Sequence, residues 1–181
     1  DRILTRLQNP AGESLFSGSL WYKPATNAGA QEGFVWIGTH GTGKSLILKY
    51  NSPNFEFSFY GNDATFNYTL SSGHWYHIAF AYSGGTASSG RRMWVNGVEV
   101  AYTSGASSTA LNLDANAQLM IGDRTDNGAD LHGSLSNFKL YDTVLTAEEV
   151  KTLYDMGRLG NGLYPLRIDA PVHINAPLYA P

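Results

Sequence analysis

The feature that most constrains the fold of this chain is a series of short apolar and aromatic runs separated by Gly, Ser and Asn clusters. The runs are LFSGSLWYKP, GFVWIG, SLILKY, FEFSFY, ATFNYTL, HWYHIAFAY, RRMWVNGVEVAY, AQLMIG and LSNFKLYD. This spacing of strand-like runs and turn residues is typical of an all-β domain. Asn96-Gly97 lies between MWV and VEV, and both residues tolerate the positive φ of a type I′ turn. A tight hairpin is therefore predicted at that position.

One segment near the C-terminus departs from the β pattern. Thr146 followed by Glu149 forms a capping box, and Gly157 is the expected C-terminal stop of a helix. The apolar residues between them fall at helical spacing, namely Val150, Leu153 and Tyr154. Many strands and a single short helix predict an all-β, two-sheet antiparallel sandwich in which each sheet buries one face.

Composition narrows the classes of partner. The 181 residues carry 12 Lys+Arg against 15 Asp+Glu, for a net charge of -3, and no basic stripe that could neutralise a phosphate backbone. We therefore expect no nucleic-acid partner. No apolar run approaches the ~18 residues of a membrane span, so no membrane insertion is expected. The absence of cysteine leaves the compartment open, and the start at Asp1 without a signal-like segment suggests a fragment or processed product.

The stretch GTHGTGKS, from Gly38 to Ser45, matches the phosphate-binding P-loop pattern. A working P-loop requires a helix after its glycines, because the helix N-terminus helps to hold the phosphates. The following LILKYNSPNFEFSFYG favours strands, and Pro53 interrupts it. The stretch is therefore predicted to be a hairpin loop without nucleotide affinity.

An ordered set of motifs gives the chain a family resemblance. These motifs are FSGSLWYKP, SSGHWYHIAFAYSGG, MWVNGVEV and LMIGDRTDNGADLHGSLSNFKLYDTVLTAEEVKTLYDMG. Across residues 14 to 160 the chain resembles the laminin G-like, concanavalin A-like lectin-glucanase superfamily. The resemblance implies a curved two-sheet jelly roll with one short helix near the C-terminus, which agrees with the strand spacing and the helix position.

Aromatic residues in the strand patterns are assigned to the core, in keeping with their size. This prediction covers Trp21, Trp75 and Trp94, while the role of Trp36 is left open. His74 and His77 form H-x-x-H on a strand, which would direct the two rings to opposite faces and argues against zinc. We expect an edge or loop histidine at His74 and a packed, hydrogen-bonded histidine at His77.

Relatives of this superfamily are mostly glycan- or protein-binding modules, and some are glycoside hydrolases. The E-x-D-x-x-E signature of the hydrolase relatives is absent, and Glu56 is the only carboxylate in FEFSFY. A retaining glycosidase needs two carboxyl groups ~5–5.5 Å apart, so the chain is predicted not to be an enzyme.

The loop GDRTDNGADLHG is the candidate binding site. Its oxygen-bearing side chains are Asp123, Asp126, Asn127 and Asp130. Calcium takes such oxygens as ligands, and laminin G-like relatives hold calcium at a loop rim beside the ligand. The same residues also suit an ordinary surface turn, so calcium and plain turn both remain open. In either case an acidic rim suits hydroxyl-rich ligands, whose OH groups donate to carboxylates.

The C-terminal segment differs from the rest of the chain. PLRIDA, PVHINA and PLYAP repeat with a period of six from Pro165, and apolar residues alternate as in an exposed strand. We expect a β-sandwich domain over residues 1–160 and an extended tail over residues 161–181. The tail could pack on the sandwich, link to a following domain or begin a fibrous β-structure of a viral or phage fibre. Asn67-Tyr68-Thr69 fits an N-glycosylation site or an ordinary strand ladder equally well.

These observations rank three functions. A non-catalytic module that recognises a glycan or glycoprotein on a cell surface or matrix comes first, with calcium as a candidate cofactor. A protein-binding adhesion or assembly module, part of a viral or phage fibre or surface protein, comes second, and a glycoside hydrolase third. The expected location is extracellular or surface-exposed, including a virion surface, with neighbouring domains or subunits contacted through the tail.

Overall fold

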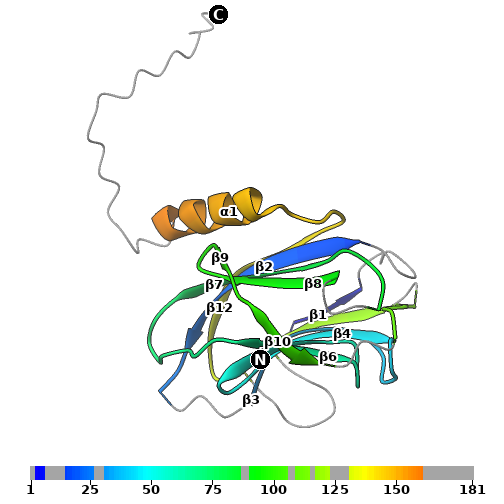
Figure 1. Cartoon of the computed structure of the whole chain (residues 1–181). Helices are drawn as coiled ribbons and strands as arrows, with labels where there is room; N and C mark the ends of the chain where they lie inside the picture. The colour runs from blue at the N-terminus through cyan, green and yellow to red at the C-terminus, as the bar shows by residue number, and fades with distance from the viewer. Residues whose placement is uncertain are drawn as a thin grey trace, which may run out of the picture.

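The protein is a two-layer β-sandwich with one helix on its outer side, as the computed structural model shows (Figure 1). The structure describes residues 3–6, 15–26, 31–86, 90–105, 109–114, 117–122 and 131–160. The tail predicted over residues 161–181 lies outside these residues, so its boundary stays a prediction. No helix in the described part of the chain is long and apolar enough to cross a membrane.

The described strands form two antiparallel sheets. The larger sheet has seven strands in the order β1-β11-β3-β4-β5-β6-β10, with bounds β1 Ile3–Arg6, β11 Gln118–Ile121, β3 Gln31–Gly38, β4 Ser45–Asn51, β5 Asn54–Ser58, β6 Asp63–Asn67 and β10 Tyr102–Gly105. The smaller sheet has five strands in the order β12-β2-β7-β8-β9, with bounds β12 Gly133–Tyr141, β2 Phe16–Pro24, β7 Tyr76–Tyr82, β8 Arg91–Val95 and β9 Val98–Glu99. The predicted all-β, two-sheet antiparallel sandwich is thus confirmed.

The main core lies between the two sheets, because alternate residues of each strand point inward. Aromatic rings dominate it, and several pack edge to face, which suits their quadrupoles. Phe57 and Phe80 lie 5.6 Å apart between centroids at 75°, and Phe59 and Tyr82 lie 4.9 Å apart at 79°. Burial of these rings from both sheets is what holds the sandwich closed.

The tryptophans occupy different layers from those expected. Trp21 and Trp94 are buried as predicted, but on the outer face of the five-stranded sheet, beneath the helix. Trp36 is buried on the outer face of the seven-stranded sheet with Ile47 and Met120. The core assignment of Trp75 is wrong: it is half-buried outside the strands, with the Lys23 ammonium 5.3 Å from its ring centroid.

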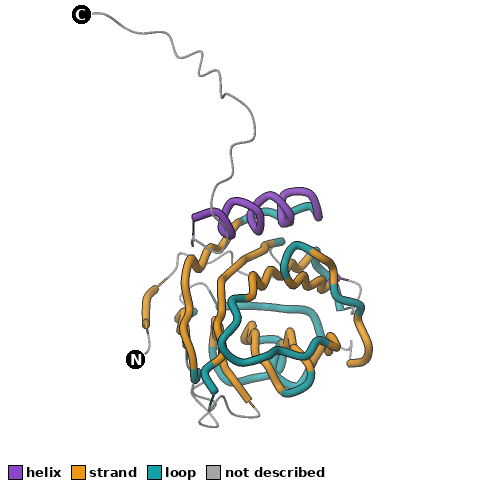
Figure 2. The backbone as a smooth tube through the Cα atoms, turned by 90° about the vertical axis from the view of Figure 1, so that its left-hand side faces the viewer, coloured by secondary structure: helices purple, strands orange, loops and turns teal. Residues whose placement is uncertain are grey.

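Helix α1 (Ala147–Gly160) covers the outer face of the five-stranded sheet, as Figures 1 and 2 show from two directions. Its capping box is confirmed, because Thr146 N donates to Glu149 Oε2 over 2.8 Å and Glu149 N donates to Thr146 Oγ1 over 3.2 Å. The prediction that Gly157 stops the helix is wrong. A Cβ at Gly157 would lie 2.5 Å from Trp21 Nε1, so glycine here permits close packing inside the helix.

Both predicted hairpins are confirmed. Asn96 and Gly97 have φ of 53° and 77° and join β8 to β9, with Val95 paired to Val98. The GTHGTGKS stretch joins the antiparallel strands β3 and β4, and Ser45 begins β4 instead of a helix. Nucleotide affinity itself stays a prediction.

The histidines and the glycosylation pattern fall in ordinary structural places. His74 is an exposed loop residue, and His77 is packed beneath helix α1 against Trp21, with 5.4 Å between ring centroids. The hydrogen bond expected for His77 is not found at Nδ1. Asn67 is the exposed last residue of β6 and pairs with Asn54 in the ladder.

Candidate functional site

A small cleft opens at the end of the sandwich where β2 and β4 finish and β3 begins. Its volume is about 170 Å³. We call it the end cleft, and its lining residues are Tyr22, Pro24, Ala25, Thr26, Glu32, Tyr50, Ser52, Leu70 and Ser72. Both sheets contribute to it, because Tyr22 belongs to the five-stranded sheet and Glu32 and Tyr50 belong to the seven-stranded sheet. A gap between sheets at their ends is where loops and strand termini bring polar groups together.

A buried carboxylate lies in the wall of the end cleft. The Glu32 side chain is 1% exposed, and β3 and β4 place it in register with Tyr50. Its Oε2 accepts a hydrogen bond from the backbone N–H of His132, and its Oε1 lies 3.3 Å from His132 Nδ1. The His132 ring is 43% exposed. The pair thus joins a carboxylate inside the fold to an imidazole at its surface.

Two tyrosines line the end cleft together with this carboxylate. The Tyr22 hydroxyl donates to the carbonyl of His132 over 3.0 Å, and the Tyr50 hydroxyl accepts from the Leu70 N–H over 3.2 Å. Burial raises the pKa of Tyr22 well above its ordinary value, and the nearby Glu32 and Tyr50 raise it further. Tyr22 therefore stays protonated and keeps its donor at physiological pH. Its role is to hold the segment at His132 against the cleft.

The predicted metal ligands Asp123, Asp126, Asn127 and Asp130 lie outside the described residues, and the prediction stays a prediction. The residues that flank them are described. Gly122 N donates to Phe34 O over 3.0 Å, and Leu131 N donates to Gly122 O over 3.3 Å. Both flanks therefore lie together beside β3, and the next residue, His132, contacts Glu32. Within the described ranges, no cluster of three or more His, Asp or Glu could hold a metal.

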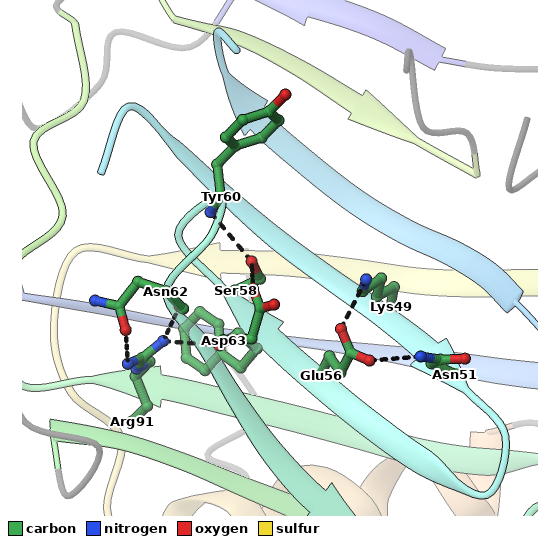
Figure 3. Close-up of polar contacts among 9 residues, drawn as sticks. Lys49, Asn51, Glu56, Ser58, Tyr60, Asn62, Asp63 and Arg91 are labelled. Atoms are coloured by element: carbon green, nitrogen blue, oxygen red, sulfur yellow. Dashed lines mark hydrogen bonds and ion pairs between the residues drawn. The ribbon is translucent and has the colours of Figure 1, made fainter. Parts of the chain in front are cut away.

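A second polar region lies on the outer face of the seven-stranded sheet (Figure 3). Lys49 Nζ lies 2.7 Å from Glu56 Oε2, and Asn51 Nδ2 donates to Glu56 Oε1 over 2.7 Å. The strand register places Lys49 directly opposite Glu56, and Ser58 opposite Asp63, where the Ser58 hydroxyl donates to the Asp63 carboxylate. We call these five residues the outer-face ladder.

The outer-face ladder bears on the hydrolase alternative. The register brings Asp63 onto the face that carries Glu56, one strand away, which sequence spacing within FEFSFY did not reveal. Both carboxylates have donors within the fold: Glu56 has Lys49 and Asn51, and Asp63 has Ser58. A catalytic acid must instead release a proton to a leaving group. The printed contacts of both carboxylates join neighbouring strands of the sheet.

Arg91 shows how a buried charge can serve the fold (Figure 3). Its guanidinium lies between the sheets, where Nη1 donates to Phe57 O over 3.0 Å and Nη2 donates to Asn62 Oδ1 over 2.9 Å. It also lies 4.5 Å from the Phe59 ring centroid. These contacts fix the turn between β5 and β6, so Arg91 is a structural residue.

Sequence reasoning missed the residues of the end cleft. Glu32, Tyr22, Tyr50 and His132 belong to four separate segments that meet only in the folded chain. One signal was present: Glu32 is the only charged residue in the apolar run QEGFVWIG. A charged residue inside a buried strand needs a polar partner from elsewhere in the chain. The presence of Glu32 in this run was therefore a sign that polar groups gather around it.

Comparison with known proteins places this chain in a family. The sequence model of the concanavalin A-like lectin/glucanases superfamily matches residues 4–151, and the chain therefore belongs to that superfamily. A search of curated proteins gave no match.

Solved structures share the fold at low sequence identity. The ligand binding domain of botulinum neurotoxin serotype D, in complex with N-acetylneuraminic acid, has 16% identity and a TM-score of 0.65 over 88% of this chain and 40% of that chain. A heptameric SAP-like pentraxin from Limulus polyphemus has 15% identity and a TM-score of 0.54, over 85% and 82%. A Trypanosoma rangeli sialidase has 17% identity and a TM-score of 0.57, over 78% and 22%. This chain thus spans less than half the length of the toxin and sialidase chains.

Proposed function

We propose that this member of the concanavalin A-like lectin/glucanases superfamily is a non-catalytic module that binds glycans on a cell surface or matrix through the end cleft. The observation that carries the proposal is the buried Glu32 carboxylate in the wall of a cleft whose outer residues bear hydroxyl groups. At about 170 Å³ the cleft is smaller than the ~300 Å³ of a drug-sized pocket. It suits one terminal sugar unit.

The chemistry of the end cleft favours neutral sugars. Sugar hydroxyls would exchange hydrogen bonds with the exposed hydroxyls of Thr26, Ser52 and Ser72, while the buried Glu32 carboxylate holds the cleft wall through His132. The half-buried Leu70 supplies an apolar part of the lining against which a sugar face can lie. The carboxylate of a sialic acid would be repelled by Glu32, although the toxin domain of similar fold was solved with N-acetylneuraminic acid.

Calcium is the proposed cofactor, held by Asp123, Asp126, Asn127 and Asp130 beside the end cleft. The donor set fits a hard cation, since all four side chains offer oxygen. The described flanks support the location, because Leu131 and His132 connect this loop to Glu32. Calcium bound there would offset the negative charge of the three aspartates and could accept sugar hydroxyls as further ligands.

Titration calorimetry on the chelator-treated protein tests the calcium site. Binding to the folded state alone stabilises it by about 2.7 kcal/mol at a hundredfold excess over Kd. We expect heat on calcium addition and a rise in Tm of several degrees. Asp126→Ala should remove most of the response, with Asp114→Ala as the matched control. If millimolar calcium produces neither heat nor a rise in Tm, the calcium site is rejected and the ordinary-turn alternative remains.

A glycan array tests the main proposal. Ser72→Phe should fill the end cleft and lower binding of neutral glycans at least tenfold. Ser71→Phe is the matched control, because Ser71 is exposed next to the cleft but does not line it. Equal binding by both variants would place the glycan site elsewhere, and no binding by the wild type to any glycan would reject the function.

A specific observation favours the protein-binding alternative. A groove of about 560 Å³ runs along β9 and β10, with Val98 68% exposed and Tyr102 40% exposed beside it. Exposed apolar side chains that gather in one patch often mark protein contacts. An adhesion or assembly module, in a viral or phage fibre or surface protein, would use this groove, and Tyr102→Asp would then abolish partner binding while glycan binding persists.

The non-catalytic part of the proposal also has a test. The carboxylates Glu56 and Asp63 already accept hydrogen bonds or an ion pair within the fold, which opposes a role as acid and nucleophile. We expect no release of reducing sugar from polysaccharides by the purified protein. Turnover that is lost in Glu56→Gln would establish a hydrolase instead. The proposed location is extracellular or surface-exposed, where such glycans occur.

A further inference from the structure

The chain contains a single N-x-S/T pattern, Asn67-Tyr68-Thr69. All three residues lie in the described part of the structure, where strand β6 ends at Asn67 and the connection to β7 begins. This pattern is an acceptor of N-linked glycosylation where its asparagine lies on the surface. The place of the three side chains in the fold therefore decides whether the pattern can carry a glycan.

The first and third residues of the pattern are exposed, whereas the middle one anchors the segment. Asn67 and Thr69 are both exposed. The Tyr68 ring between them packs on the main core, 6.2 Å from the Phe55 ring and 6.1 Å from the Tyr76 ring between centroids. Residues i and i+2 share one face of an extended chain. The acceptor amide and the hydroxyl two residues further on are therefore presented together at the surface.

The backbone of this segment is held in place by its neighbour strand. Asn67 pairs with Asn54 of β5, and the Tyr68 N–H donates to Pro53 O over 3.2 Å. The ladder thus uses the backbone of Asn67 and leaves its side chain at the surface. A glycan on this residue would project from a fixed point at the end of the seven-stranded sheet.

The side-chain amide of Asn67 differs from those of other asparagines of the sandwich. Hydrogen bonds from the side chains of Asn51, Asn62 and Asn96 hold the outer-face ladder, the turn between β5 and β6, and the hairpin of β8 and β9. Across the described ranges, no hydrogen bond uses the side chain of Asn67. Its amide nitrogen can therefore be substituted without loss of a contact that the fold needs.

We propose that Asn67 is an N-linked glycosylation site of this protein. In the transfer step Asn67 Nδ2 forms a bond to the anomeric carbon of an oligosaccharide donor linked to a lipid diphosphate. The bond between that carbon and the diphosphate breaks, and the amide nitrogen loses one proton, so no atom is oxidised or reduced. The folded sandwich then carries a sugar chain at the end where β6 finishes.

The register gives the position of this sugar chain on the sandwich. Asn67 follows Asp63 and Thr65 at two-residue spacing on β6, so it lies on the outer face of the seven-stranded sheet. Leu70, in the segment that follows, lines the end cleft. The glycan would therefore stand on the outer side of the sheet, next to the rim of the end cleft.

Secretion of the full chain from cultured eukaryotic cells tests the site, because those cells supply the donor and the transferase. We expect the wild type to carry the added mass of a glycan, which a peptide-N-glycosidase removes with conversion of Asn67 to aspartate. Asn67→Gln and Thr69→Ala should lack the glycan, whereas Thr69→Ser should keep it, since serine also completes the pattern. Mass spectrometry of the intact proteins and of their peptides measures these differences.

The same variants made in bacteria without the transferase are the matched folding controls. We expect Asn67→Gln and Thr69→Ala to melt at the Tm of the wild type, because both residues are exposed. A marked fall in Tm for Asn67→Gln would show that this side chain serves the fold, against the proposal.

Two results with the secreted protein would also overturn the proposal. One is a folded wild type that carries no glycan at Asn67. The other is a glycosylated fraction that aggregates or melts well below the unglycosylated fraction, because the sugar chain would then be incompatible with the folded sandwich. A glycosylated wild type that melts at or above the Tm of Asn67→Gln from the same cells supports the site.

Discussion

The outer faces of the two sheets differ in the residues that they carry and in how those residues are stabilised. The outer face of the five-stranded sheet is apolar and lies beneath helix α1, with Ala79, Ala81 and Trp94 packed against Leu145 and Val150. The outer face of the seven-stranded sheet carries the outer-face ladder of Lys49, Asn51, Glu56, Ser58 and Asp63. The first face is stabilised by burial of apolar surface, whereas the second combines the buried cluster of Trp36, Ile47 and Met120 with charges that are paired along the ladder.

The difference shows that the residues on the outer face of a strand indicate whether another element must cover that face. Strands β7 and β8 put small and large apolar residues on their outer face, which only a covering element can shield from water. Strands β4, β5 and β6 put polar residues on theirs, which pair across the ladder. Four substitutions test this contrast, and they follow from the largest expected effect to the smallest.

The first prediction removes a fully buried ring beneath helix α1. Trp94 is fully buried, so Trp94→Ala should lower the free energy of unfolding by about 3–5 kcal/mol, because it leaves a cavity beneath the helix. Chemical denaturation measures the loss. Trp75→Ala, at a half-buried position outside the strands, should cost clearly less. Equal costs would mean that the helix does not depend on this face.

The second prediction uses pH to probe the same face. The pKa of His77 is lowered from 6.5 to about 4, first because burial disfavours the charged ring and second because of the positive charge of Lys139. The unfolded chain takes up a proton below pH 6.5, whereas folded His77 stays neutral until about pH 4. Its contribution to stability is therefore fully present above pH 6.5 and is lost as the pH falls toward 4, by about 3 kcal/mol.

Denaturation curves between pH 7 and pH 4 check this for the wild type and His77→Phe. The variant keeps an aromatic ring against Trp21 and Tyr154 but cannot titrate. The difference in stability between the two proteins should therefore change with pH over this range. Curves for His77→Phe that run parallel to those of the wild type would show that His77 does not titrate between these limits.

The third prediction breaks the outer-face ladder. The Lys49 and Glu56 side chains are 11% and 12% exposed, so Lys49→Met should leave a poorly solvated carboxylate and cost about 2 kcal/mol. The double variant Lys49→Met with Glu56→Leu should recover most of this loss, because neither charge remains. Thermal and chemical denaturation of the two single variants and the double variant give the coupling free energy between Lys49 and Glu56. An additive double variant would contradict the paired-charge account.

An exposed ion pair is the matched control for the ladder. Arg92 and Glu99 are 39% and 44% exposed. Glu99→Gln should therefore cost less than about 1 kcal/mol, since water screens the remaining charge.

The fourth prediction concerns the closest approach of helix α1 to the sheet. Gly157→Ala would place a Cβ 2.5 Å from Trp21 Nε1, so the helix must shift. Alanine favours a helix by about 1 kcal/mol over glycine, but overpacking costs about 1–3 kcal/mol, and we expect a net loss of about 1 kcal/mol. Met156→Ala, at a residue that is 65% exposed, should be nearly neutral. A stabilised Gly157→Ala would show that the helix sits farther from Trp21.

Local features were predictable because each depends on residues close together in the chain. The Asn96-Gly97 turn, the Thr146–Glu149 capping box and the hairpin at GTHGTGKS all follow from the conformational preferences of a few neighbours. The sandwich itself followed from the recurrence of strand-length runs with one helix. These predictions needed no knowledge of which strands pair.

Features that depend on strand pairing could not be predicted in this way. The two-residue alternation of the strands indicates that Trp21 and Trp94 lie on buried faces. It does not show whether the other sheet or a helix covers those faces. The same limit applies to Gly157, which resembles a helix stop until Trp21 is placed beneath it. The end cleft is the clearest case, because Tyr22, Glu32, Tyr50 and His132 come from distant segments.

The sequence by itself thus determined the kinds of element, their turns and caps, and the alternating pattern of the tail, since these depend on backbone preferences within a few residues. The tertiary structure alone decided which face of each sheet is covered, where Glu32 finds His132, and how Lys49 meets Glu56. The physical reason is that burial and charge pairing are properties of two surfaces in contact, and the second surface is supplied by a part of the chain far away in sequence.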